Sequence, residues 1–155
     1  MVAIAVREDV VLRDGSTLRL RPTSAADEAA LLEFFERLSP ETRYLRFQGA
    51  VSVDAHLIAS FLRSDGEESL SLIGELIDDS GEVRVIGLGT WVRLRDPSRA
   101  EVAFVVADEF QHRGIGSRLL ERLAVHARDA GIDRFVAQVL PENAAMLRVF
   151  GDAGF

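Results

Sequence analysis

The sequence contains no cysteine, one tryptophan, one tyrosine and only four prolines among its 155 residues. The absence of cysteine excludes disulfide bonds, a thiolate nucleophile and any metal site with cysteine ligands. No apolar run approaches the roughly 20 residues that a membrane-spanning helix needs, so we expect a soluble, cytoplasmic protein without a membrane partner. The net charge of −7 argues against general binding to nucleic acid, which requires basic surface.

The remaining composition is typical of a single globular domain. The length and the apolar share of 48% suit one domain with a sizeable core. The three histidines, His56, His112 and His126, lack the spacing of metal ligands, and we expect no metal site.

Turn and cap residues predict a hairpin and three helices in the first half of the chain. An Asp-Gly turn at 14–15 separates two predicted strands, at about 10–12 and 17–21. Helices are then expected from a cap at 23 or 24 to about 38, from 39–41 through 47, and from a cap at 52 or 54 to about 63.

In the second half, predicted strands and helices alternate. We expect strands at about 70–77, 83–94 and 101–106, a long amphipathic helix from 115 to a glycine cap at 131, a strand at 134–140 and a last helix at 143–152. This order favours an α/β or α+β domain with a mixed sheet. Because the sequence ends at Phe155 directly after a helix, we expect a truncated piece of a longer protein or a missing partner domain.

The segment Gln111–Ser117 is the most informative motif, because its two glycines stand where a strand turns into the long helix. The N–H groups in the first turn of a helix have no intrahelical partner, and where no side chain covers them they can bind a phosphate or a pyrophosphate. A P-loop would need a lysine beside the glycine, and a Rossmann fingerprint would need a third glycine. Neither is present, and packing glycines at a strand-to-helix turn explain the bare pattern equally well.

Three separated motifs together resemble the GNAT family of acyl-CoA-dependent N-acetyltransferases. The strand 101–106 is similar to the family's fourth strand, and the segment 111–116 to its pyrophosphate-binding Arg/Gln-x-x-Gly-x-Gly/Ala motif. The segments 141–143 and 154–155 resemble the family's asparagine-containing last helix and the Gly-Phe that follows it. The resemblance implies one GNAT domain over residues 1–155, with a mixed, mostly antiparallel sheet that is splayed at its central strands and flanked by helices. The family's C-terminal strands would then be missing.

The segments 12–22 and 39–47 narrow the resemblance to the Pat-type bacterial protein lysine acetyltransferases, which modify acyl-CoA synthetases. In such proteins the GNAT domain is commonly fused to a regulatory or synthetase-like domain. The resemblance therefore implies acetyl-CoA as cosubstrate and a protein lysine, possibly on an acyl-CoA synthetase, as acceptor. The alternatives are acetylation of a small amine or a protein N-terminus, and a sensor domain that binds acyl-CoA without turnover.

The resemblance also implies a set of cosubstrate-binding residues, in which the glycine segment holds the CoA pyrophosphate and the strand before it pairs with the pantetheine arm. These residues are Phe104, Val105, Val106, Gln111, His112, Arg113, Gly114, Ile115, Gly116, Ser117 and Asn143. A bulge in the strand would splay the sheet and admit the arm. For Asn143, a role as helix N-cap is an equal alternative.

Glu101 is the predicted general base, because the acceptor amine must lose a proton before it attacks the thioester. The alternative is a structural ion pair with Arg95 or Arg99. Without cysteine the chain cannot form a thioester-linked acyl-enzyme, which leaves direct attack in a ternary complex, with a backbone N–H near Val105 or Val106 stabilising the oxyanion. Phe150 stands where many family members have the tyrosine that protonates the departing thiolate.

Overall fold

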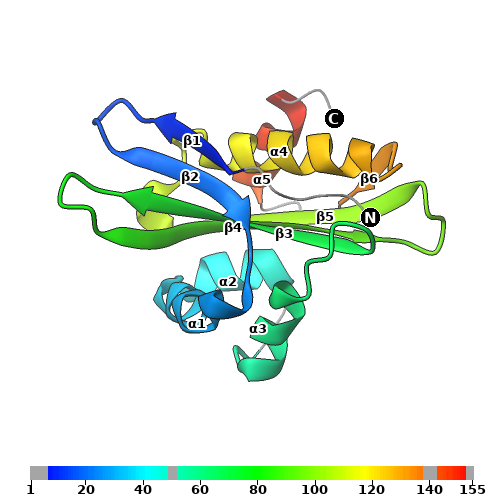
Figure 1. Cartoon of the computed structure of the whole chain (residues 1–155), viewed down its shortest axis with the longest axis horizontal. Coiled ribbons are helices and arrows are strands. Elements are labelled where there is room, and N and C mark those ends of the chain that lie inside the picture. The colour runs from blue at the N-terminus through cyan, green and yellow to red at the C-terminus, as the bar shows by residue number, and fades with distance from the viewer. Residues whose placement is uncertain (1–6, 49–51, 138–142, 153–155) are drawn as a thin grey trace.

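The computed structural model describes residues 7–48, 52–137 and 143–152 as a six-stranded sheet between two helical layers (Figure 1). The strands are β1 (Glu8–Val11), β2 (Thr17–Pro22), β3 (Ser69–Ile77), β4 (Val83–Arg93), β5 (Arg99–Val106) and β6 (Arg134–Val136). The helices are α1 (Glu28–Arg37), α2 (Pro40–Phe47), α3 (Ala55–Leu62), α4 (Ile115–Asp129) and α5 (Ala144–Asp152), with 3-10 turns η1 (Ala25–Asp27) and η2 (Asp108–Phe110).

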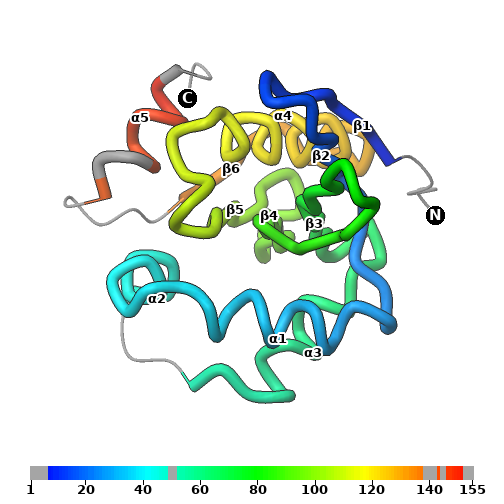
Figure 2. Tube along the Cα trace, turned by 90° about the vertical axis from the view of Figure 1, so that its left-hand side faces the viewer, coloured from blue at the N-terminus to red at the C-terminus, as the bar shows by residue number. Residues whose placement is uncertain are grey.

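The sheet has the strand order β1-β2-β3-β4-β5-β6, and all neighbouring strands are antiparallel except β5 and β6, which are parallel. Helices α1, α2 and α3 cover one face, and α4 and α5 cover the other (Figure 2). The predicted α+β class with a mixed, mostly antiparallel sheet is confirmed.

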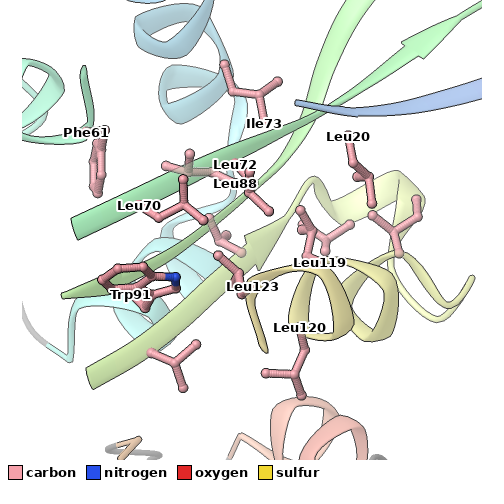
Figure 3. Close-up of a cluster of buried hydrophobic side chains, with 14 of the residues drawn as sticks. Leu20, Phe61, Leu70, Leu72, Ile73, Leu88, Trp91, Leu119, Leu120 and Leu123 are labelled. Atoms are coloured by element: carbon pink, nitrogen blue, oxygen red, sulfur yellow. The ribbon is translucent and has the colours of Figure 1, made fainter. Parts of the chain in front are cut away.

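Apolar side chains from both helical layers meet the sheet in one core. On the α4 side, Leu119 and Leu123 point toward the sheet, and Trp91 of β4 is fully buried there (Figure 3). The close approach of α4 depends on small residues in β4, because a Cβ at Gly89 would lie 2.8 Å from Cδ1 of Leu123. The core therefore fixes α4, and with it the glycine segment at its start, against the centre of the sheet.

Ser24, one of the two predicted caps, is the N-cap of the first helical segment, but its first turn is the 3-10 turn η1, and α1 begins at Glu28. Asp27 is buried and accepts hydrogen bonds from the backbone N–H of Ser24 at 2.7 Å and from Nη2 of Arg21 at 2.7 Å. Arg21 also contacts Glu75 on β3. These bonds hold Asp27 close to the end of β2, so the chain makes a tight 3-10 turn before the α-helix begins.

β6 is described over Arg134–Val136, where it pairs with the first three residues of β5, Arg99 to Glu101. Residues 138–140 of the predicted strand lie outside the described part of the chain. No described strand pairs with residues 102–106 of β5 on that side, so over the described residues an open edge follows Glu101.

The expected bulge in β5 is absent. The register between β4 and β5 runs without a shift from Gly87–Val106 to Arg93–Ala100, and the irregularity in the sheet lies between Gly74 and Glu75 of β3. β5 therefore stays regular along β4, and over the described residues its other edge is unpaired beyond Glu101. Over the described residues, no helix combines the length and the apolar character that crossing a bilayer demands.

Candidate active site

The backbone conformation of the segment between β5 and α4 brings several N–H groups together. His112 and Gly114 both lie in the left-handed region, with φ of 63° and 83°. A non-glycine residue rarely adopts this conformation, and such strain is concentrated at functional sites. Successive backbone N–H groups in turns of this kind form concave anion-binding sites.

The first turn of α4 adds donors that no side chain covers. Gly114 is the N-cap and, having no side chain, makes no capping hydrogen bond. The first intrahelical bond from this turn runs from the N–H of Arg118 to the carbonyl of Gly114. The N–H groups of Ile115, Gly116 and Ser117 therefore remain available to an anion, which the positive end of the helix dipole also favours.

A cavity of about 320 Å³ opens between this segment, the end of β5, α2 and α5. Its walls are formed by Thr42, Leu45, Arg46, Phe104, Val105, Val106, Phe110, Gln111, His112, Gly114, Ile115, Gly116, Ser117, Asn143, Met146, Arg148 and Val149. All of the predicted cosubstrate-binding residues except Arg113 border it. The guanidinium of Arg113 lies instead over the ring of Phe110, 5.5 Å from its centroid.

The open edge of β5 presents backbone groups toward this cavity. The N–H of Ala107 bonds to the carbonyl of Ile86 on β4 at 2.8 Å. Since the direction of backbone groups alternates along a strand, the N–H groups of Phe104 and Val106 point away from β4, toward the side where β6 no longer pairs. The N–H of Val105 points toward β4. Of the two predicted oxyanion donors, only Val106 thus has its N–H on the open side.

Glu101 lies at the start of this open edge and does not border the cavity itself. It is exposed and occupies the face of β5 opposite to Phe104, because side chains alternate along a strand. Within the described part of the chain, Glu101 forms no ion pair with Arg95 or Arg99, so the structural alternative for this carboxylate is wrong.

The last helix brings Asn143 and Phe150 to different places. Asn143 caps α5 by accepting a hydrogen bond from the N–H of Met146 at 3.2 Å, and it also borders the cavity. The prediction of an N-cap is confirmed, and the capping bond leaves the residue at the cavity wall. Phe150 is buried and packs on Phe104 with ring centroids 5.8 Å apart, behind the cavity lining.

A hydrogen-bond network joins α2 to the segment after β5. Asp108 accepts bonds from the N–H of Ser39 at 3.1 Å and from Oγ1 of Thr42 at 3.0 Å. Although burial opposes the change, these hydrogen bonds lower the pKa of Asp108 below its ordinary value. Nε2 of Gln111 donates to Oγ1 of Thr42 at 3.3 Å and to the carbonyl of Val106 at 3.0 Å. The glycine segment and α2 are thus fixed relative to one another.

The contribution of α2 to the cavity was not predicted from the sequence. Thr42, Leu45 and Arg46 all border the cavity, although no role was predicted for them beyond the resemblance of their segment to Pat-type proteins. Arg148 on α5 was missed as well. Arg118, on the first turn of α4, lies 4.0 Å from Glu8 and does not border the cavity.

Comparison with known proteins agrees with this geometry. Residues 17–155 match the family model for the acetyltransferase (GNAT) domain. An acetyltransferase of Pseudomonas aeruginosa is 28% identical over 145 residues, which cover 93% of this chain and 77% of that protein. The acetyltransferase Pat of Mycolicibacterium smegmatis is 32% identical over 151 residues, 94% of this chain, but this chain spans only 43% of its length.

Among solved structures, the GNAT domain of S. lividans PAT superposes with a TM-score of 0.85 at 38% identity, covering 96% of this chain and 86% of that one. The family match extends over most of the sequence, and both the glycine segment and the open edge of β5 lie within it. The chain therefore belongs to the GNAT family of acetyltransferases, and it is similar to the GNAT domains of Pat-type proteins.

Proposed function

We propose that this chain transfers an acetyl group from acetyl-CoA to the ε-amine of a protein lysine. The observation that carries the proposal is the cavity between the uncapped first turn of α4 and the open edge of β5. The first turn of α4 offers N–H donors to the pyrophosphate of CoA, and the edge of β5 offers backbone hydrogen-bonding groups to its amide-rich pantetheine arm. The similarity to Pat-type GNAT domains supports the assignment of a lysine acceptor.

In the proposed reaction the acceptor nitrogen attacks the thioester carbonyl directly. Glu101 takes a proton from the amine, either directly or through water, and the N–H of Val106 stabilises the oxyanion. The carbon–sulfur bond then breaks, the amide forms, and CoA departs as a thiolate that water protonates. No covalent intermediate with the protein is needed, because the chain has no cysteine.

The acceptor lysine lies outside this sequence. All 18 basic residues counted as Lys or Arg are arginine, so the chain carries no lysine of its own. Acyl-CoA synthetases are the proposed protein acceptors, on the basis of the Pat-type similarity. The lack of lysine has a practical benefit, since lysine acetylation detected in an assay mixture can only belong to the acceptor.

The test is release of CoA thiol from acetyl-CoA in the presence of candidate acyl-CoA synthetases, lysine peptides and small amines. We expect Glu101→Gln to lower kcat by at least about 100-fold, because a positioned general base typically contributes this much, while the affinity for CoA stays unchanged. Glu121→Gln, which alters an exposed glutamate on α4, is the matched control and should retain full activity. Full activity of Glu101→Gln would refute the role of Glu101.

The second candidate function is a sensor that binds acyl-CoA without turnover. One observation favours it: Phe150, which replaces the tyrosine of many family members, packs behind Phe104 and offers no proton to a leaving group. Tight CoA binding with no thiol release from any acceptor would support the sensor and refute the enzyme.

A further inference from the structure

Arg46 on α2 borders the cavity without an anionic partner. Its guanidinium carbon lies 4.9 Å from the ring centroid of Phe47 and 5.9 Å from that of Phe61. Its Nε is buried and has no hydrogen-bond partner, and no ion pair joins Arg46 to another residue in the described ranges. Arg46 as a whole is half-buried. Aromatic faces compensate a cation only partly, and burying a polar group without a partner is costly. A bound anion would supply the missing partner.

The position of Arg46 along α2 separates it from the pyrophosphate-binding segment. Thr42, in the first turn of α2, is hydrogen-bonded to Asp108 and Gln111, and Arg46 follows one turn later, about 6 Å along the helix axis. Burial lowers the pKa of Arg46 to about 10, and the negative charge of Glu101 partly opposes this shift. The helix that carries Arg46, α2, packs against β5, the strand that carries the proposed general base.

The face of the sheet on which Arg46 lies indicates whether Arg46 contacts the acceptor or acetyl-CoA. Glu101 projects on the face of β5 opposite to Phe104, and α2 packs against β5 from the layer that covers this opposite face. The first turn of α4, which is proposed to hold the CoA pyrophosphate, lies on the other face with Phe104. An anion at Arg46 thus lies on the acceptor side, next to the group that would deprotonate the amine.

The charge of the cavity wall agrees with this orientation. Of the described residues, two arginines, Arg46 and Arg148, border the cavity, and no aspartate or glutamate does. The protein as a whole is acidic, with a net charge of −7. An acidic acceptor would be repelled by most of the surface, so it needs a local cation at the point of docking.

We propose that Arg46 binds a carboxylate of the acceptor and so selects acceptors in which an acidic group lies close to the reactive amine. This inference rests on the proposed acetyltransferase function. A guanidinium suits the task because it binds a carboxylate through two parallel hydrogen bonds. The carboxylate belongs either to an aspartate or glutamate beside the target lysine of a protein or to a free amino acid, and the two sources share the same chemistry.

The test compares matched acceptors in the thiol-release assay at saturating acetyl-CoA. One pair consists of lysine peptides that differ by a glutamate or a glutamine near the lysine, and the other pair consists of an amino acid and its amide. In one of the two pairs, we expect the wild-type protein to have a kcat/KM at least about tenfold higher for the acidic acceptor than for its neutral counterpart. A ratio of this size is in the range of a charge-assisted hydrogen bond. The preferred pair identifies the source.

Arg46→Met should abolish this preference, mainly by raising KM for the acidic acceptor more than KM for its neutral counterpart. Arg46→Lys keeps the positive charge but lacks the planar guanidinium that binds a carboxylate through two hydrogen bonds, so it should retain part of the preference. Arg37→Met removes an exposed arginine that pairs with Glu33 on α1 and is the matched control. Thermal unfolding should show Arg46→Met to be no less stable than wild type, because an unpaired buried charge is removed.

Three results would overturn the inference. The first is a wild-type protein that is active but does not distinguish the acidic from the neutral acceptors. The second is an Arg46→Met variant that keeps the preference. The third is an Arg46→Met variant that loses activity with succinyl-CoA but not with acetyl-CoA, because this would show that Arg46 contacts the acyl group. Absence of thiol release with every acceptor would instead refute the proposed function itself, and this inference with it.

Discussion

Replacing Gly116 with alanine is expected to press directly on the ring of Phe104. A Cβ built at Gly116 lies 2.8 Å from Cε2 and 3.3 Å from Cδ2 of Phe104, whereas ordinary contact begins near 3.4 Å. The ring must therefore move by about 0.6 Å, a displacement typical of overpacking. Phe150 packs against the ring of Phe104, and the ring also lines the cavity, so the cavity is the space into which it can move. The variant should therefore narrow the cavity as well as strain the core.

Two opposing effects set the size of the change. Overpacking of a core typically costs about 1–3 kcal/mol, and replacing a helical glycine with alanine returns at most about 1 kcal/mol. We expect a net loss of about 1 kcal/mol in the free energy of unfolding. For a chain of this length that corresponds to a fall of roughly 2–4 °C in Tm. KM for acetyl-CoA should rise because Phe104 is part of the cavity wall.

A double-mutant cycle with Phe104→Leu provides the test. Urea denaturation gives the free energy of unfolding of the wild type, both single variants and the double variant. If the contact causes the loss, Gly116→Ala should cost little or nothing once the ring is shortened. Equal losses in both backgrounds would show that Phe104 is not the source, and the steric reasoning would be refuted.

Three further outcomes are expected. Asp108→Asn should lower the free energy of unfolding by about 1–2 kcal/mol in urea titrations, because the charge-assisted bonds to α2 are weakened. Hydrogen bonds from Arg21 lower the pKa of Asp27, so their contribution is complete above the unfolded value of about 3.9 and is lost as the pH falls through the lower folded value. Urea midpoints between pH 6 and 3 should therefore fall less for Asp27→Asn than for wild type. Gly114→Ala should cost about 1–2 kcal/mol in thermal unfolding, because φ is 83° there, and Gly114→Asn should cost less.

The sequence predicted the elements whose signals are local. Asp-Gly and Ser-Gly turns placed the hairpins, and helical periodicity located α4 together with the glycine segment before it. Its C-terminal glycine has the predicted role, since Gly131 has φ of 84° just beyond the last turn. The 3-10 geometry of the turn after Ser24 was not predicted, because it depends on the bonds of Asp27 to Arg21 and Ser24, and a buried side-chain network of this kind has no periodic signature.

The part of the cavity wall that α2 forms was missed for a similar reason. The amphipathic pattern of α2 indicates that one of its faces packs against the protein, but it does not reveal that Asp108 and Gln111 fix the helix beside β5. Arg46 looks in the sequence like any other surface arginine. Its burial depends on Phe61, which comes from a different helix and is distant along the chain.

β5 and α5 both line the cavity, but they are held in different ways. The position of β5 is set by its unbroken pairing with β4 from Gly87–Val106 to Arg93–Ala100. α5 is not part of the sheet and packs against α4. Substitutions on the side of α5 that faces the cavity can therefore reshape the cavity while the pairing of β5 stays unchanged.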